Sequence, residues 1–153
     1  MDLKALIAQQ RASVEATKTE TVNVVLGREL VEVEISRLLP DDWQSLVAAN
    51  PPRKTSKSDA NIGYDQNGLP RNYPAAKIRV AGEPVSSDMW RELYEVLNSV
   101  NRNNVGTVIW GLNVYEAIQE LQELGKAVAD SQSASQGNRA SRRVASKGGS
   151  PRK

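Results

Sequence analysis

The sequence predicts an α+β fold in which a small antiparallel sheet packs with four or five helices. Two observations predict it. Two short runs alternate between apolar and polar residues, and the segments around them repeat apolar residues at helical spacing. A third feature bounds the fold, because the last residues contain almost no large apolar side chain. We therefore expect one α+β domain over residues 1–130 and a disordered Ser/Arg/Lys-rich tail over residues 131–153.

The alternating runs predict a β-hairpin, since side chains along a strand point to opposite faces in turn. The apolar positions of the two runs are Val22, Val24, Leu26, Val31, Val33 and Ile35. Gly27 and Arg28 lie between the runs, and a glycine at the first central position suits a type II′ turn. Ile78 and Val80 predict a short third strand.

Helices are predicted around this hairpin. Asp2 is placed to cap a first helix, whose apolar positions are Leu3, Leu6, Ile7 and Val14. Pro40 and the acids Asp41 and Asp42 suit the start of a second helix, which Pro51 ends. Residues 51–76 are polar and rich in turn-forming residues, and they are predicted to form a long loop.

The second half of the domain predicts three further helical segments. Ser86 to Asp88 offer caps for the first, residues 101–104 interrupt it, and residues 105–112 form a short helix. Asn113 and Glu116 have the spacing of a capping box, which predicts a last helix from there. The tryptophans, Trp43, Trp90 and Trp110, all fall on apolar stripes. Each is predicted to pack in the core, and a partner-facing role for one of them stays open.

The composition excludes several kinds of catalytic chemistry. The chain has no cysteine and no histidine, so disulfides, thiol nucleophiles and Ser–His or Cys–His catalysis are excluded. No glycine-rich phosphate-binding pattern occurs. Asp41–Asp42 is interpreted as helix-terminal charge, and residues 59–65 lack the glycine and glutamate positions of an EF-hand calcium loop. We therefore predict no enzymatic activity, no cofactor and no metal site.

The charge of the chain is unevenly distributed. The tail carries six cations and no acid: Arg139, Arg142, Arg143, Lys147, Arg152 and Lys153. Residues 1–130 contain the other fourteen cations and all eighteen acids, so the net charge of the domain is −4. The tail cations are the candidate partner contacts, through weak and salt-sensitive contact with nucleic acid or through contact with an acidic protein. A merely solvating tail is the alternative.

The order of motifs resembles the tail assembly chaperones of long-tailed phages, particularly those of actinobacterial hosts. The resemblance covers nearly the whole chain. It rests on LPDDWQSLVAANPP (39–52), LPRNYPAAKI (69–78), SSDMWRELYEVLNSVNRNNVGTVIWGLN (86–113) and SRRVASKGGSPRK (141–153). It adds no catalytic residues and places no client-binding positions.

The resemblance implies a specific function. Such proteins bind the phage tape measure protein and keep it soluble while the tail tube polymerises. They act in the host cytoplasm and are absent from the mature virion. A programmed frameshift commonly yields a longer isoform, and this chain matches the short one. The tail-tube protein, the longer isoform and further copies of the chain are additional expected partners.

Two other functions remain open at this stage. One is a small nucleic-acid-binding protein that uses the basic tail as its contact arm, although the negative charge of the domain argues against it. The other is a structural head–tail phage protein. No apolar run approaches the ~18 residues that a membrane span needs, and the first ten residues do not form a secretory signal. The cytoplasm is therefore the expected location.

Overall fold

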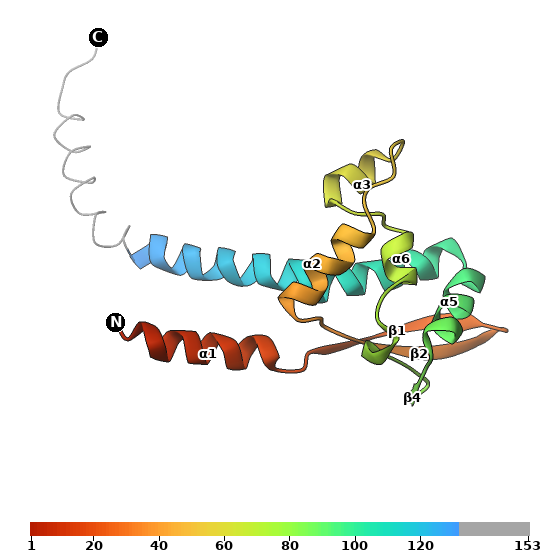
Figure 1. Ribbon diagram of the computed structural model, residues 1–153, viewed down its shortest axis with the longest axis horizontal. Helices are drawn as coiled ribbons and strands as arrows, with labels where there is room; N and C mark the ends of the chain where they lie inside the picture. The colour runs from red at the N-terminus through yellow and green to blue at the C-terminus, as the bar shows by residue number, and fades with distance from the viewer. Residues whose placement is uncertain (132–153) are drawn as a thin grey trace, which may run out of the picture. The chain divides into compact units, whose positions relative to one another are not determined.

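The computed structural model describes residues 1–131 (Figure 1). The chain divides into two compact units. The first unit is Met1–Tyr115 and the second begins at Glu116. The first unit holds an antiparallel sheet together with helices, so the α+β prediction is confirmed. The prediction of one domain over residues 1–130 stays a prediction. The predicted disordered tail lies outside the described residues from residue 132 onward.

The sheet has four antiparallel strands in the order β1-β2-β3-β4. β1 (Thr19–Leu26) pairs along its whole length with β2 (Glu29–Ser36). β3 (Ile78–Val80) pairs with β2, and β4 (Glu83–Pro84) pairs with β3. The predicted hairpin and third strand are confirmed. The sequence analysis did not predict β4, whose proline suits its place at the edge of the sheet.

The turn between β1 and β2 is of type I′ and not of the predicted type II′. Gly27 and Arg28 both have positive φ, at 54° and 68°, whereas a type II′ turn needs positive φ only at the first central residue. Type I′ turns match the right-handed twist of paired strands. The pairing of two eight-residue strands therefore holds Arg28 in a conformation that its own side chain does not favour.

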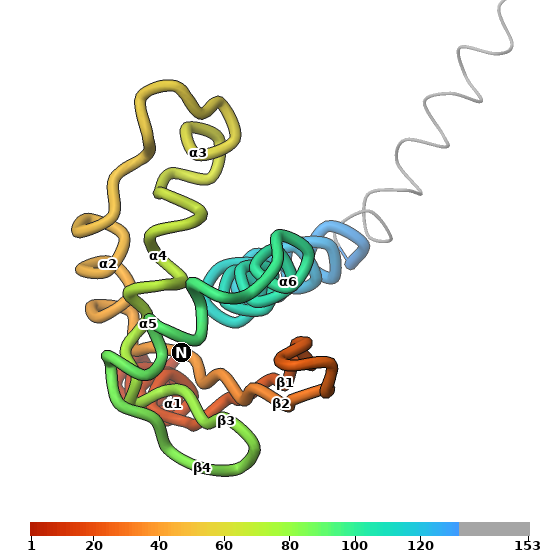
Figure 2. Tube along the Cα trace, turned by 90° about the vertical axis from the view of Figure 1, so that its right-hand side faces the viewer, coloured from red at the N-terminus to blue at the C-terminus, as the bar shows by residue number. Residues whose placement is uncertain are grey.

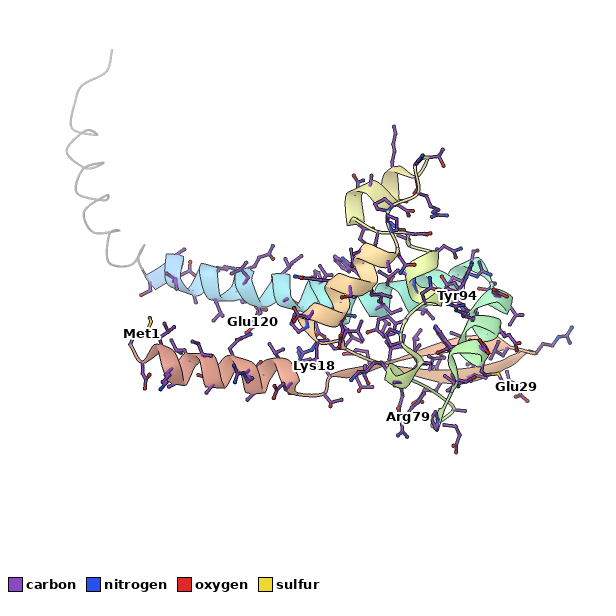
Figure 3. The ribbon with its side chains drawn as sticks, viewed as in Figure 1. Met1, Lys18, Glu29, Arg79, Tyr94 and Glu120 are labelled. Carbon is purple, nitrogen blue, oxygen red and sulfur yellow. The ribbon has the colours of Figure 1, made fainter. Side chains whose placement is uncertain are left out.

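One face of the sheet forms part of the core, as the alternation predicted. Val24, Val33 and Ile35 are fully buried on it. α6 (Ser99–Trp110) packs against β1, and α4 (Gly68–Arg71) contacts both α5 (Ser87–Val96) and α6 (Figure 2). Figure 3 shows the labelled Tyr94 directed into the first unit, while Glu29 and Arg79 project from the sheet. The other buried core residues are Leu38, Tyr64, Leu69, Tyr73, Ile78, Trp90, Tyr94, Leu97, Val105, Ile109 and Leu112.

Three predicted helix starts are confirmed, two by side-chain caps and one by a proline at the first helical position. The Asp2 carboxylate accepts a 3.2 Å hydrogen bond from the Ala5 amide at the start of α1 (Leu3–Glu15). Pro40 is the first residue of α2 (Pro40–Ala49). At the start of α5, the Ser86 hydroxyl accepts a 3.1 Å hydrogen bond from the Met89 amide. The two side-chain caps each accept from an amide that the first helical turn leaves unpaired, and Pro40 has no such amide.

The prediction of a long loop over residues 51–76 is wrong. This segment contains α3 (Lys57–Ile62), α4 and the single turn η1 (Ala75–Lys77). Ser56 caps α3, and Gly63 ends it with a φ of 93°. Helices of four to six residues are too short to show an apolar period. They form because the segment buries Asp59, Leu69 and Tyr73, which the sequence alone does not signal.

Two predicted breaks in the last part of the first unit are also absent. α6 runs through residues 101–104, because the Asn98 side chain caps it earlier by accepting a 2.8 Å hydrogen bond from the Asn101 amide. The π-helical turn η2 (Gly111–Tyr115) continues the helical backbone across Asn113. The predicted helix start at Asn113 is therefore wrong.

The Asn113 side chain serves tertiary structure instead of a local cap. Its amide group donates to the Ile109 carbonyl at 2.9 Å and to the Tyr73 hydroxyl at 3.0 Å. Its oxygen accepts a 3.0 Å hydrogen bond from the Leu38 amide. These bonds link η2 to the end of β2, where the Tyr73 hydroxyl donates to the Ser36 carbonyl. Both N–H donors of the Asn113 amide and one of the two lone pairs of its oxygen are thus used in these bonds.

The three tryptophans divide between core and surface. Trp90 is fully buried, and its Nε1–H donates to the Pro70 carbonyl at 2.9 Å, so its predicted core role is confirmed. Trp43 is partly buried against the core, with its ring edge-on to Tyr64. The prediction is wrong for Trp110, which is half-buried outside the core cluster, with its ring centre 5.1 Å from that of Tyr115.

Candidate functional site

The second unit presents an amphipathic helix, formed by residues 116–131, whose apolar side chains are exposed. Its apolar face consists of Ile118, Leu121, Leu124 and Val128. At about 100° of rotation per residue, these four positions fall within about one third of the helix circumference. Leu121 is 73% exposed and Leu124 is 60% exposed. We refer to these four residues as the C-terminal stripe.

α1 presents a second exposed stripe. None of its residues is buried, and its apolar positions Leu3, Leu6, Ile7 and Val14 lie within about 100° of one another on the helix. Leu3 is 65% exposed. Arg37 holds only the C-terminal end of α1, because its Nη2 donates to the carbonyls of Ser13 and Ala16 at 2.9 and 3.0 Å. The helix is thus anchored at the end where Val14 is partly buried, while Leu3, Leu6 and Ile7 stay exposed.

Such faces indicate interaction surfaces. Contiguous apolar surface is uncommon on a monomer unless a partner covers it, and an isolated helix of this length is marginally stable without packing. Regular helical spacing of the exposed side chains is also what a helical partner would require. The two stripes are therefore candidates for protein binding.

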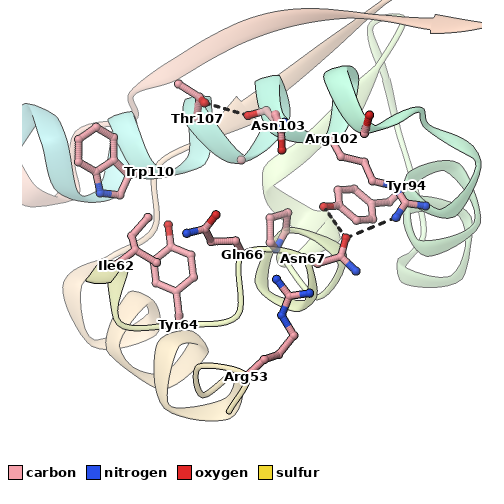
Figure 4. Close-up of a pocket in the computed structure, with 13 residues that line it drawn as sticks. Arg53, Ile62, Tyr64, Gln66, Asn67, Tyr94, Arg102, Asn103, Thr107 and Trp110 are labelled. Carbon is pink, nitrogen blue, oxygen red and sulfur yellow. Dashed lines mark hydrogen bonds between the residues drawn. The ribbon is translucent and has the colours of Figure 1, made fainter. Parts of the chain in front are cut away.

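The first unit also contains a pocket of about 590 Å³ between α6 and residues 53–67 (Figure 4). We call it the α6 pocket. One wall is a face of α6, formed by Arg102, Asn103, Gly106, Thr107 and Trp110. The facing wall contains Arg53, Ile62, Tyr64, Gln66 and Asn67. Figure 4 shows Trp110 and Arg102 at opposite ends of the pocket, with Gln66 between them.

The aromatic hydroxyls at the pocket stay protonated near neutral pH. Burial raises the pKa of Tyr64 to about 12. Burial also raises the pKa of Tyr94, whose hydroxyl donates to the Asn67 side-chain oxygen at 3.3 Å. The Arg102 guanidinium lies over the Tyr94 ring, 5.2 Å from its centre. No lining residue is a carboxylate. The lining therefore offers hydrogen bonds and positive charge and suits binding.

An ion pair between the buried Asp59 and the half-exposed Arg53 shapes the wall opposite α6. The Asp59 side chain is fully buried, and it accepts hydrogen bonds from Arg53 Nε at 2.8 Å and from Arg53 Nη2 at 3.2 Å. The backbone amides of Arg53 and Gln66 donate to the same carboxylate. The hydrogen bonds from the Arg53 side chain have the largest effect on the pKa of Asp59, and those from the two backbone amides add to it. Together they hold this pKa well below its usual range, although burial acts in the opposite direction.

The predicted tail contacts, Arg139, Arg142, Arg143, Lys147, Arg152 and Lys153, all lie outside the described residues. Asp41 and Asp42 are exposed in the first turn of α2, where the helix dipole favours them. Over residues 1–131, no three acidic side chains come together as a metal site. In the same range, no helix is both long enough and apolar enough to cross a bilayer.

Comparisons with protein-family models, with curated proteins and with solved structures find no match to this chain. The resemblance to tail assembly chaperones therefore rests on the motifs quoted above.

Sequence reasoning missed the α6 pocket for an identifiable reason. The spacing of Arg102, Gly106 and Trp110 places them on one helix face, since residues four apart are neighbours there. The prediction that residues 101–104 interrupt the helix hid this face. The opposite wall contains residues 53–67, which the sequence analysis interpreted as loop, and their position against α6 depends on tertiary packing.

Proposed function

We propose that this protein is a phage tail assembly chaperone that binds the tape measure protein and keeps it soluble without catalysis. The single observation that carries the proposal is the exposed C-terminal stripe on residues 116–131. The motif resemblance implies that the client is the tape measure protein. An extended helical client exposes apolar stripes until the tail tube surrounds it, and a second amphipathic helix can cover such stripes.

The stripes suit reversible binding by several copies. Each stripe offers only four apolar side chains on a single helix, so one contact buries little area and gives modest affinity. Several copies along one client, or short and long isoforms together, would retain it through high effective concentration. A growing tail tube can then displace the copies one at a time. The proposed setting is the host cytoplasm.

Co-expression with the tape measure protein tests this proposal. We expect the client to be soluble and to co-purify when this chain is present, and to aggregate when it is absent. Purified components should behave in the same way without any nucleotide. A client that is equally soluble without this chain, or that associates with neither isoform, would contradict the proposal.

A pair of variants ties the effect to the C-terminal stripe. Leu121→Glu combined with Leu124→Glu places two charges on the apolar face, and we expect client recovery to fall about tenfold or more because each charge would be desolvated on binding. Gln119→Glu combined with Ala127→Glu adds the same charge to the polar face and should bind as the parent does. Equal loss in both variants would assign the effect to charge and not to the stripe.

A further inference from the structure

We propose that the α6 pocket binds a short extended peptide of a partner protein, with an apolar side chain at one end and a carboxylate at the other. None of its lining residues belongs to α1 or to residues 116–131. The inference thus goes beyond the proposed chaperone function, and it stands or fails independently of client binding.

The length of the pocket matches about four extended residues. Arg102, Gly106 and Trp110 follow one another at four-residue intervals along one face of α6. At 1.5 Å per residue, this wall is about 12 Å long. An extended chain advances about 3.3 Å per residue, so about four peptide residues span the same distance. The volume of about 590 Å³ is in the range of ligand-binding sites.

The two ends of the pocket have different chemistry. Trp110, Ile62 and Tyr64 supply apolar surface at one end, and Arg102 lies at the other (Figure 4). The Asp59 and Asp65 carboxylates contact Arg53 but do not line the pocket. Both charged lining residues are therefore arginines. Asp59 and Asp65 compensate the charge of Arg53, so Arg102 is the lining residue that best complements an anionic group.

The arginines keep some capacity for such a group. Arg53 uses Nε and Nη2 to bind Asp59, and its Nη1 has no hydrogen bond within the described part of the chain. Arg102 holds the Leu97 and Glu95 carbonyls with Nε and Nη2, while its Nη1 makes only a long 3.4 Å contact with Asn67. A peptide carboxylate can therefore reach a guanidinium without breaking the bonds that hold the pocket together.

Amide side chains between the two ends favour a peptide over an apolar ligand. Gln66 and Asn103 are exposed, and within residues 1–131 their side-chain amides make no hydrogen bond. Each amide offers donors and an acceptor, which match the N–H and C=O of an extended backbone. Gly106 has no side chain to fill the space beside these amides. A Cβ at this position would contact only Pro70, at 3.9 Å.

The test uses the full chain, labelled with ¹⁵N, and two peptides: acetyl-Leu-Ala-Gly-Glu-amide and its reverse, acetyl-Glu-Ala-Gly-Leu-amide. We expect one of them to shift the Trp110 indole N–H and the Gln66 and Asn103 side-chain amides in a saturable manner. The buried Trp90 indole should not move. The matching peptide with lysine in place of glutamate should bind about tenfold more weakly or not at all, because its positive charge is repelled by Arg102.

Variants at two helical glycines locate the binding. Gly106→Leu fills the pocket, with no backbone neighbour to clash, and should abolish the shifts while melting stays unchanged or rises. Gly111→Leu is the matched control, because a Cβ there has no neighbour within 4 Å. The proposal is overturned if neither peptide shifts these signals, if glutamate and lysine peptides bind equally, or if Gly106→Leu binds as well as Gly111→Leu. It is also overturned if benzoate alone reproduces the shifts, which would indicate a small-anion site.

Discussion

Replacing Trp90 with alanine is expected to lower the free energy of unfolding by about 3–5 kcal/mol. The Trp90 side chain is fully buried, so its removal leaves a large cavity that the surrounding core cannot fill. The Pro70 carbonyl also loses the indole hydrogen bond. Chemical denaturation followed by circular dichroism measures the change.

Two further variants separate the causes of this loss. Trp90→Phe retains most of the ring but leaves the Pro70 carbonyl unpaired, which should cost about 1–3 kcal/mol. Met89→Ala changes the adjacent, exposed residue of α5 and should cost within about 0.5 kcal/mol. If Trp90→Ala cost no more than Met89→Ala, the assignment of Trp90 to the core would be wrong.

Asp59→Ala is expected to have the second-largest effect, lowering the free energy of unfolding by about 2–4 kcal/mol. The change leaves the backbone amides of Arg53 and Gln66 without their acceptor, and it removes the ion partner of Arg53. The wall of the α6 pocket should loosen with it. Amide exchange over residues 53–67 would show the local effect. Glu92→Gln, at an exposed position of α5, is the control and should leave stability nearly unchanged.

The same ion pair predicts the response to acid. The pKa of Asp59 is lowered by folding, so its stabilising contribution is present above its unfolded pKa of about 3.9 and is lost as pH falls below that value. The parent protein should therefore lose stability between about pH 4 and pH 2, and the deficit of Asp59→Ala should shrink over the same range. A deficit that does not change with pH would contradict the assignment.

The sheet could be predicted because its signal is local. The alternation through Val24, Val33 and Ile35 and the turn at Gly27 lie within one short stretch, and the caps at Asp2 and Ser86 are read from neighbouring residues. The turn type could not be predicted in the same way, because strand twist and not the glycine alone selects type I′.

The candidate sites were predicted less well, since they depend on contacts between distant residues. Apolar positions in α1 and in residues 116–131 were visible in the sequence, but their exposure was not. The sequence offered residues 59–65 only as an incomplete calcium loop, since the burial of Asp59 depends on packing that brings Arg53 to it. Asn113 matched a local capping pattern, yet its partners Tyr73 and Leu38 lie far away in sequence.

The connection between β2 and β3, residues 37–77, places one wall of the α6 pocket on an insertion between adjacent strands. Strand pairing fixes only the two ends of an insertion, and the entropy of closing it rises slowly with length. Chains of this fold could therefore lengthen, shorten or replace parts of this connection while Val33 still pairs with Val80. Selection for peptide preference would then act on residues 53–67, and selection for folding would act on other parts of the gene. Sequence divergence between homologues should therefore concentrate in residues 53–67.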